Sequence, residues 1–403
     1  MQRLAITIHV RITYFADVRF PLERANGIQT METCHALATR GHSVDLIVRP
    51  DTHSPPRDPF TFYALTADAR LRVERAPVAG PAAARRFGYL AFAVGRAIGR
   101  KRADVLVTRD LGVASAILEL PLTLRPPLVY ESHGYAPEVA AALPALVATA
   151  TTPSARKLRR LARREAHVWR RADGYVTITA ALRTELEGRF AGRTRTVVVP
   201  DGVRLQPRLP DRAPREGSAI VGYAGHLYTW KGVDVLLEAL ARLPATRGLI
   251  IGGHEAEPDL ARTKSIADRL GLRDRVTFTG LVEPARVAEL LTQADVLVLP
   301  NPASAISTRY TSPLKLFEYM AAGKPIVSSD LPSIREILRD GENALLVAPG
   351  NPSALASAIE RLLNNPSLAA RLAHAALEEV PNYSWQRRAE RLEALFAETI
   401  AAG

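Results

Sequence analysis

The sequence predicts an α/β protein made of two Rossmann-like domains, with parallel sheets that face each other across a central cleft. Two observations carry this prediction. Strand-like segments alternate with segments of helical periodicity along all 403 residues, and both halves open with a strand, a loop and a helix. A Pro- and Arg-rich stretch without periodicity, residues 204–217, separates the halves. We therefore expect an N-terminal domain over residues 1–207 and a C-terminal domain over residues 215–385. A last helix over residues 386–403 is expected to pack back on the first domain.

The first half begins with a βαβ unit. A polar loop leads from its first strand into an amphipathic helix, which Gly41 ends before the next strand. The strands expected in this half cover residues 4–10, 43–48, 104–108, 128–131, 174–179 and 196–200. The expected helices cover residues 28–39, 84–102 and 154–171.

The second half continues the alternation. Proline stands at the start of several helical segments, where its missing N–H costs nothing. The expected strands cover residues 219–223, 248–251, 276–278, 296–299, 325–329 and 343–347. The expected helices cover residues 233–242, 260–270, 284–292, 313–322, 352–363, 366–379 and 385–401.

Composition excludes a disordered chain and a disulfide framework. Apolar residues make up 47% of the chain and charged residues 23%, as in folded globular proteins. Cys34 is the only cysteine, so a disulfide or a cysteine-based metal site is excluded and a reducing compartment is expected. The first ten residues lack a basic leader, and no run of about 18 apolar residues occurs. We expect a cytoplasmic protein without a signal peptide or a transmembrane helix.

The net charge of +12 lies entirely in the first half. Residues 1–200 contain 30 Lys and Arg against 17 Asp and Glu, whereas residues 201–403 contain 23 against 24. Residues 154–171 alone carry eight basic residues and one acidic residue, beside the small apolar segment 139–152. This pattern is compatible with docking on an anionic membrane face, with a solvated Arg-rich helix, or with nucleic acid. Nucleic acid ranks lowest, because the basic stretch has only one aromatic residue for stacking, Trp169.

Residues 307–330 form the most distinctive candidate binding element, a polar loop followed by a helix and a strand. Ser312 is the expected N-cap, Pro313 the first helical residue and Gly323 the residue after the helix end. Free amides at such a helix start favour an anion, most naturally phosphate. Glu318, further along the helix, can accept hydrogen bonds from two adjacent hydroxyls, as on a ribose. The alternative is that Ser312 only caps the helix and that Glu318 is solvated.

Two residues of the first half are further candidates. Gly27 stands near the start of the first helix, where a backbone can approach a ligand, although no GxGxxG pattern is present. His133 directly follows a strand, at the end that faces the ligand crevice in α/β sheets. A structural role for this histidine is equally compatible with the sequence.

Together these stretches resemble glycosyltransferase family 4, which comprises retaining enzymes with the GT-B fold. The strongest matches lie in the second half: GYAGHLYTWKGVDVLLEAL (222–240), VTFTG (276–280), TSPLKLFEYMAAGKPIVSSD (311–330) and DLPSIREILRDGENALLVAPGN (330–351). Weaker matches in the first half are NGIQTMETCHALATRGHSV (26–44), His133 after its strand, ADGYVTITAALRTEL (172–186) and VVVPDGV (197–203). The resemblance covers most of the chain and does not identify the donor.

The resemblance implies a role for each matching position. The residues implied to bind the donor diphosphate are Gly27, Gly225, His226, Lys231, Ser312, Leu314 and Lys315. Glu318 would bind the ribose. The donor sugar would be bound by His133, Tyr310 and Thr311, and the base would lie near Gly252, Thr279 and Gly280. The implied catalytic residues are His133, Lys231 and Glu318.

Two positions depart from the family pattern. His226 replaces an arginine that usually accompanies Lys231, and Tyr310 replaces the first glutamate of the E-x7-E motif. A neutral imidazole supplies less charge than a guanidinium group, and the loss of the glutamate changes how the donor sugar can be held. Relatives with Ser-Pro-Leu-Lys-Leu-Phe-Glu-Tyr-Met commonly lack that glutamate, so activity is still expected.

The expected function is therefore that of a retaining glycosyltransferase. It would move a sugar from a nucleotide-diphosphate sugar to a glycan or a polyprenyl- or lipid-linked acceptor, in cell-envelope polysaccharide or glycolipid biosynthesis. No metal or other cofactor is expected, because the GT-B fold that the resemblance implies binds its donor without a metal; the absence of an Asp-x-Asp sequence agrees with this. Four arginines, Arg159, Arg160, Arg163 and Arg164, would face the acceptor or the inner membrane surface. Two alternatives are a non-catalytic GT-B subunit that binds nucleotide sugar or lipid, and a nucleotide-sugar 2-epimerase, for which we identify no acid/base set.

Overall fold

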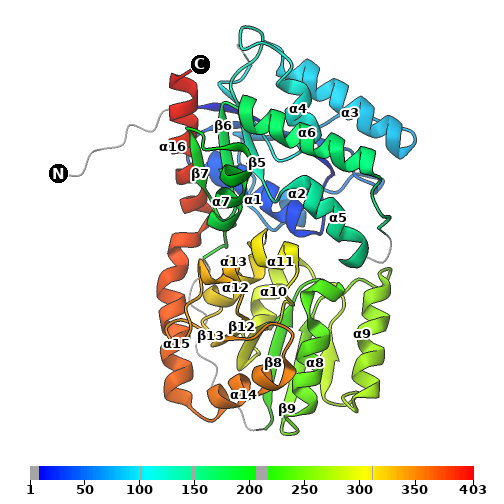
Figure 1. Ribbon diagram of the computed structural model, residues 1–403, viewed down its shortest axis with the longest axis vertical. Coiled ribbons are helices and arrows are strands. Elements are labelled where there is room, and N and C mark those ends of the chain that lie inside the picture. Colours follow the sequence, from blue (N-terminus) through cyan, green and yellow to red (C-terminus); the bar gives the residue numbers. More distant parts are fainter. Residues whose placement is uncertain (1–8, 100–101, 147–149, 206–216, 311) are drawn as a thin grey trace, which may run out of the picture. The chain divides into compact units, whose positions relative to one another are not determined.

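The computed structural model describes residues 9–99, 102–146, 150–205, 217–310 and 312–403, and the chain divides into two compact units (Figure 1). Unit 1 comprises the residues up to Pro137, Ser154–Asp201 and Trp385–Gly403. Unit 2 comprises Glu138–Pro153 and Gly202–Ser384. Unit 1 is therefore assembled from segments at both ends of the sequence.

Unit 1 contains a parallel sheet of seven strands in the order β3-β2-β1-β4-β5-β6-β7. The strands are β1 (Arg11–Arg19), β2 (Ser43–Arg49), β3 (Leu71–Arg75), β4 (Val105–Thr108), β5 (Leu128–Ser132), β6 (Gly174–Thr177) and β7 (Thr196–Val198). Strand β1 lies between β2 and β4, so the strand order reverses there. In doubly wound sheets, ligands bind beyond the carboxyl ends of the strands at such a reversal.

Helices follow most of these strands. They are α1 (Ala25–Thr39), α2 (Pro59–Phe62), α3 (Ala82–Ala97), α4 (Leu111–Ile117), α5 (Ala136–Leu146), α6 (Ala155–Arg171) and α7 (Ala180–Phe190), with α16 (Trp385–Ala401) at the end of the chain. Helix α5 belongs to unit 2 from Glu138 on. Helix α16 packs beside α1 and beside the edge of the sheet. Gly174 in β6 allows this approach, because a Cβ atom there would lie 2.8 Å from Thr399 Oγ1.

Unit 2 contains a second parallel sheet, of six strands in the order β10-β9-β8-β11-β12-β13. The strands are β8 (Ala219–Ala224), β9 (Thr246–Ile251), β10 (Val276–Phe278), β11 (Val296–Leu299), β12 (Ile326–Ser329) and β13 (Leu345–Val347). The helices are η1 (Thr229–Lys231), α8 (Val233–Ala241), α9 (Pro258–Arg269), α10 (Pro284–Leu291), α11 (Ala305–Arg309), α12 (Leu314–Ala321), α13 (Pro332–Arg335), α14 (Pro352–Leu363), α15 (Pro366–Glu379) and η2 (Val380–Tyr383). The prediction of two Rossmann-like parallel sheets is confirmed.

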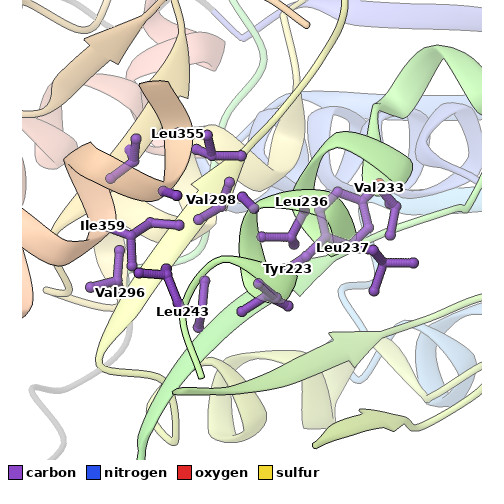
Figure 2. Packing of buried hydrophobic residues seen from close by; sticks show 14 of the residues in the cluster. Tyr223, Val233, Leu236, Leu237, Leu243, Val296, Val298, Leu355 and Ile359 are labelled. Atoms are coloured by element: carbon purple, nitrogen blue, oxygen red, sulfur yellow. The ribbon is translucent and has the colours of Figure 1, made fainter. Parts of the chain in front are cut away.

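Apolar side chains cover both faces of the second sheet. On one face, Val296 and Val298 of β11 pack with Leu236 of α8 and with Leu355 and Ile359 of α14 (Figure 2). On the other face, Leu297 and Leu299 pack with residues of α12 and α13. Strands buried on both faces are nearly continuous in apolar residues, which explains why the sequence identified them.

Some local predictions differ from the structure. The first described strand is Arg11–Arg19; residues 9 and 10 stand before it, and residues 4–8 of the expected strand lie outside the described residues. Ile12, Tyr14 and Phe15 of strand β1 are buried, so this strand supplies core side chains. Helix α3 ends at Ala97, before the expected residue 102, and helix α11 (Ala305–Arg309) includes Thr308 and Arg309, where a loop was expected.

Candidate functional site

In unit 2, the buried ammonium group of Lys315 marks the candidate site. Lys315 lies in the first turn of α12 and is only 7% exposed. Among the described residues, its Nζ atom has no hydrogen-bond partner. That atom lies 4.0 Å from the centroid of the Tyr223 ring and 3.8 Å from the position of a Cβ atom on Gly225. A buried, unpaired cation beside the loop that follows β8 is a suitable partner for an anionic ligand.

Lys231 contributes a second positive charge to the same place. Its Nζ atom lies 3.7 Å from the centroid of the Trp230 ring, in the η1 turn that follows β8. Burial lowers the pKa of Lys231 to about 7. Burial also lowers the pKa of Lys315, as does the charge of Lys231, whereas the charge of Glu318 acts in the opposite direction. Two ammonium groups that repel each other and lose hydration are stabilised by an anion bound between them.

The loop that carries Lys231 is held by glycine. Gly232 has φ +74°, and a Cβ atom there would lie 1.9 Å from the carbonyl oxygen of Pro300, after β11. Gly225 has φ +132°, and a Cβ atom on Gly252 would lie 2.4 Å from the carbonyl oxygen of Gly225. The loops after β8, β9 and β11 therefore meet closely at the carboxyl edge of the sheet.

His226 lies in the same loop but is paired with a carboxylate. Its Nδ1 atom lies 3.3 Å from Glu257 Oε2, and its ring stacks on that of Tyr228 with centroids 5.1 Å apart. The Tyr228 hydroxyl donates to Glu257 Oε1 over 2.8 Å. The sequence analysis did not identify Glu257, because 31 residues separate it from His226 and it belongs to no recognised motif.

Helix α12 begins one residue later than predicted. Its first residue is Leu314 and its N-cap is Pro313, without a side-chain cap, so the prediction that Ser312 caps the helix is wrong. The reason is that Pro313 has an extended backbone (ψ 120°) and so stands outside the helix. Glu318 lies one turn after Lys315 and is half-buried, close enough for its charge to act on Lys315.

The residues predicted to lie near the base come together beside the β8 loop. The backbone N–H of Gly252 donates to Thr279 Oγ1 over 3.2 Å, and Gly252 forms an antiparallel bridge with Gly280. Thr279 in turn donates to the carbonyl oxygen of Gly280 over 2.9 Å. Because Gly252 also contacts Gly225, this bridge lies next to the two lysines.

Tyr310, at the position of the missing glutamate, is 4% exposed and engaged with another carboxylate. Its hydroxyl donates to Glu138 Oε2 over 2.6 Å, and Arg309 Nη2 lies 2.9 Å from the same oxygen. Glu138 lies in the first turn of α5, a helix that the sequence analysis did not describe. Thr311, the other residue assigned to the sugar on this loop, lies outside the described residues.

In unit 1, His133 belongs to a buried polar network. Its Nε2 atom lies 2.6 Å from Glu131 Oε1, which also accepts from Gln29 Nε2 over 2.6 Å. Arg388 Nη2, on helix α16, donates to Glu131 Oε2 over 2.6 Å. Arg109 Nη1 donates to Gln29 Oε1 over 2.8 Å.

The charges of this network set its protonation states. Burial acts to raise the pKa of Glu131, but the positive charge of Arg388 and the hydrogen bond from His133 hold that pKa well below its ordinary value. Burial, with the charge of Arg109, lowers the pKa of His133 to about 4. At neutral pH, His133 is therefore a neutral imidazole oriented by an ionised carboxylate. Such a group can exchange hydrogen bonds with a hydroxyl without adding charge.

Neighbouring atoms pack so closely against Gly27 that they leave no space for a Cβ atom. A Cβ atom there would lie 2.3 Å from the carbonyl oxygen of Leu22 and 2.5 Å from the hydroxyl oxygen of Tyr63. Leu22 and Tyr63 both belong to unit 1. The sequence analysis expected a ligand to approach the backbone of Gly27, and the structure shows that these protein atoms approach it.

The four arginines of α6 differ in their surroundings. Arg159, Arg160 and Arg163 are exposed, whereas Arg164 is half-buried beside α4.

Within the described ranges, no helix is long and apolar enough to cross a membrane. Over the same ranges, no group of three or more His, Cys, Asp or Glu side chains is placed to hold a metal ion.

Two family models match the chain, and together they cover most of it. A model described as "Glycosyl transferases group 1" matches residues 218–365. A model described as "Glycosyltransferase Family 4" matches residues 27–207. Each match therefore covers most of one predicted domain.

Curated relatives match over part of their length. The phosphatidyl-myo-inositol mannosyltransferase of Mycobacterium leprae (strain TN) is 34% identical over 214 residues, 51% of this chain and 54% of that protein. The D-inositol 3-phosphate glycosyltransferase of Nocardia farcinica (strain IFM 10152) is 30% identical over 286 residues, 66% of this chain and 60% of that protein. The chain thus spans little more than half the length of the curated relatives it matches.

Solved structures match over nearly the whole chain. Sucrose-phosphate synthase from Thermosynechococcus elongatus has a TM-score of 0.76 at 22% identity, over 98% of this chain and 100% of that one. HepE of Anabaena, in complex with UDP and glucose, has a TM-score of 0.72 at 18% identity, over the same shares. At these identities the similarity shows the fold alone.

Proposed function

Since this chain belongs to the group 1 glycosyltransferases and has the GT-B fold, we propose that it transfers a sugar from a nucleotide-diphosphate sugar to a glycan or lipid-linked acceptor. One observation carries the donor half of this proposal. Lys315 and Lys231 place two ammonium groups at the carboxyl end of β8, and the buried Lys315 has no hydrogen-bond partner within the described residues. A diphosphate supplies the compensating charge.

The same lysines explain how the reaction is accelerated. As the bond between the anomeric carbon and the diphosphate breaks, negative charge grows on the leaving phosphate oxygens. Fixed positive groups that are already poorly hydrated stabilise that charge without reorganising. Lys231 and Lys315 perform this role in the proposal, and the first turn of α12 adds the backbone N–H of Leu314 and Lys315.

Other residues position the donor. Glu318 accepts hydrogen bonds from the ribose hydroxyls, and the bridge between Gly252 and Gly280 lies beside the base. His133 is neutral and its Nε2–H donates to Glu131, so its Nδ1 atom accepts a hydrogen bond from a sugar hydroxyl. We propose that transfer proceeds with retention and without a metal, the leaving phosphate taking the acceptor proton.

A panel of nucleotides tests the donor site. UDP, GDP, ADP and their common sugars are added to the wild type and to Glu318→Ala, and the melting temperature is recorded. A ligand that binds the native state raises that temperature. We expect one nucleotide to give a shift that Glu318→Ala loses. No shift with any of them would refute the donor site.

Nucleotide binding is expected to weaken as the pH rises from 7.5 to 9. The phosphates are already ionised in this range, whereas Lys231, with a pKa of about 7, is losing its proton. A bound diphosphate raises the pKa of both lysines, so binding takes up protons. The affinity should fall by about tenfold per pH unit for each proton taken up. Calorimetry in buffers of different ionisation enthalpy measures this uptake, and no uptake at pH 8 would contradict the assignment.

The acceptor half rests on the relatives and on α6. One relative is named for phosphatidyl-myo-inositol and another for D-inositol 3-phosphate. The exposed basic face of α6 suits contact with an anionic membrane surface, and we propose a peripheral location there.

Reversing two exposed charges, Arg159→Glu with Arg163→Glu, is expected to weaken binding to anionic vesicles by at least about tenfold, since each basic residue near the surface contributes about 1 kcal/mol. Equal sedimentation of the variant and the wild type with these vesicles would remove the membrane proposal.

The contact between Tyr310 and Glu138 supports a second candidate function. It occupies the place where the family's first glutamate would contact the donor sugar, and it favours a non-catalytic subunit that binds nucleotide sugar. The nucleotide panel separates the two functions when it is combined with a product assay. Binding without turnover on any acceptor would favour the non-catalytic subunit.

A further inference from the structure

Three arginines of unit 1 lie near one another without a partner. Arg86 is on α3, and Arg160 and Arg164 are on α6, one turn apart. Within the part of the chain that the structure describes, none of the three takes part in a hydrogen bond or an ion pair. This distinguishes them from arginines such as Arg57 and Arg388, which are paired with carboxylates.

The guanidinium groups of Arg86 and Arg164 converge over the first turn of α4. A Cβ atom on Gly112 would lie 3.8 Å from Arg164 Nη1 and 3.9 Å from Arg86 Nη2. Helices α3 and α6 each pack on α4, and Figure 1 shows the three together. Burial and the charges of Arg160 and Arg86 lower the pKa of Arg164, whereas the charge of Asp110 acts in the opposite direction.

The neighbouring carboxylates are already engaged. Asp110 caps α4, where it accepts from the N–H of Gly112 over 2.8 Å and from that of Val113 over 2.9 Å. Asp17, at the end of β1, is paired with Arg49 over 2.9 Å. Each compensates part of the positive charge, but Asp17 is shared with Arg49, so these two carboxylates do not offset all three guanidinium groups.

The cluster also lies where a ligand is expected. Asp110 and Gly112 follow β4, and β4 pairs with β1 at the reversal of strand order. Arg109, which contacts Gln29 of the His133 network, directly precedes Asp110. The arginines and His133 are thus on the same carboxyl edge of one sheet.

We propose that Arg86, Arg160 and Arg164 bind a phosphate group carried by the acceptor. The assignment of the bound molecule as the acceptor rests on the proposed function, whereas the phosphate site itself does not. Guanidinium groups present paired N–H donors that match phosphate oxygens, and two groups on separate helices can hold one phosphate from two sides. The phosphate belongs either to a lipid headgroup or to a soluble sugar phosphate.

The test uses glycerol 3-phosphate and vesicles of phosphatidylcholine with phosphatidic acid as probes. The variant Arg86→Gln with Arg164→Gln removes both converging groups. Arg156→Gln with Arg170→Gln is the control, because it removes two exposed charges, one near each end of α6. We expect the first variant to weaken binding of glycerol 3-phosphate by at least about tenfold and the control by less than about twofold.

The two probes distinguish the sources of the phosphate. Loss of glycerol 3-phosphate binding in the first variant indicates a soluble phosphate. A loss seen only with the vesicles indicates a lipid headgroup. Equal binding of both probes by the two variants would overturn the proposal and leave a solvated basic face.

Two further measurements keep the result interpretable. If the first variant does not fold, the site is tested on the wild type instead, by comparing amide hydrogen exchange with and without glycerol 3-phosphate. If glycerol 3-phosphate does not protect α3 and α6 from exchange, the proposed site is overturned. The nucleotide panel is repeated on each variant, where an unchanged shift is expected. A wild type that binds phosphate but no nucleotide would refute the proposed function and leave the phosphate site standing.

Discussion

Replacing Arg388 with methionine is expected to lower the free energy of unfolding by about 3–5 kcal/mol. The Arg388 guanidinium and the Glu131 carboxylate are both buried, and they form a hydrogen bond of 2.6 Å. Without the guanidinium group, the buried negative charge of Glu131 would lose the positive charge that stabilises it most. Arg388 also donates to the carbonyl oxygens of Val199 and Pro200, which would lose a donor. Urea unfolding, followed by fluorescence, measures the change.

The neighbouring residue supplies the control. Arg387 is exposed and paired with Glu390, so Arg387→Met is expected to change the free energy of unfolding by less than about 1 kcal/mol. A double variant, Arg388→Met with Glu131→Leu, removes both charges and should recover part of the loss. If Arg388→Met is as stable as Arg387→Met, the ion pair contributes little to unit 1.

Replacing Lys315 with methionine is expected to lower kcat by about 10²–10³, the usual effect of removing one group that stabilises developing negative charge. The same change should raise the melting temperature of the ligand-free protein. Lys315 Nζ is buried without a hydrogen-bond partner in the described region, and its pKa is lowered by burial, so its charge destabilises the empty site. Methionine fills a similar volume without that charge.

These opposite effects make the test specific. Lys264 is exposed on α9, and Lys264→Met is the matched control, for which neither kcat nor the melting temperature should change appreciably. The variant Lys315→Met should also lose the shift in melting temperature that a nucleotide gives to the wild type. Unchanged turnover in Lys315→Met would show that the reaction does not use this ammonium group.

The sequence predicted the fold best where local signals were complete. Helices α14 and α15 begin and end where they were predicted, because asparagine caps and a first-turn proline define their starts. Strand β1 was missed because charged residues stand at both ends of Arg11–Arg19 and inside it, and its burial in the sheet is not visible in the sequence. Short helices such as α4 and α11 span too few residues to show periodicity.

The candidate site was predictable where the resemblance supplied it. That resemblance implied Lys231 and Lys315, and the structure adds that Lys315 is buried and unpaired within the described residues. The link from His133 through Glu131 to Arg388 was not predictable, since 257 residues separate the two ends of that ion pair. Glu138 beside Tyr310 was missed for the same reason, because 172 residues lie between them.

The position of Arg388 in the sequence has a consequence for biosynthesis. Unit 1 needs helix α16, which is translated only after the whole of Gly202–Ser384. At a translation rate of about 5–20 residues per second, the ribosome takes roughly 10–40 s to make that intervening part. During this time Glu131 has no guanidinium partner, so unit 2 can complete its fold before unit 1 does. A nascent chain stalled before Trp385 should therefore contain a protease-resistant unit 2 and a protease-sensitive unit 1.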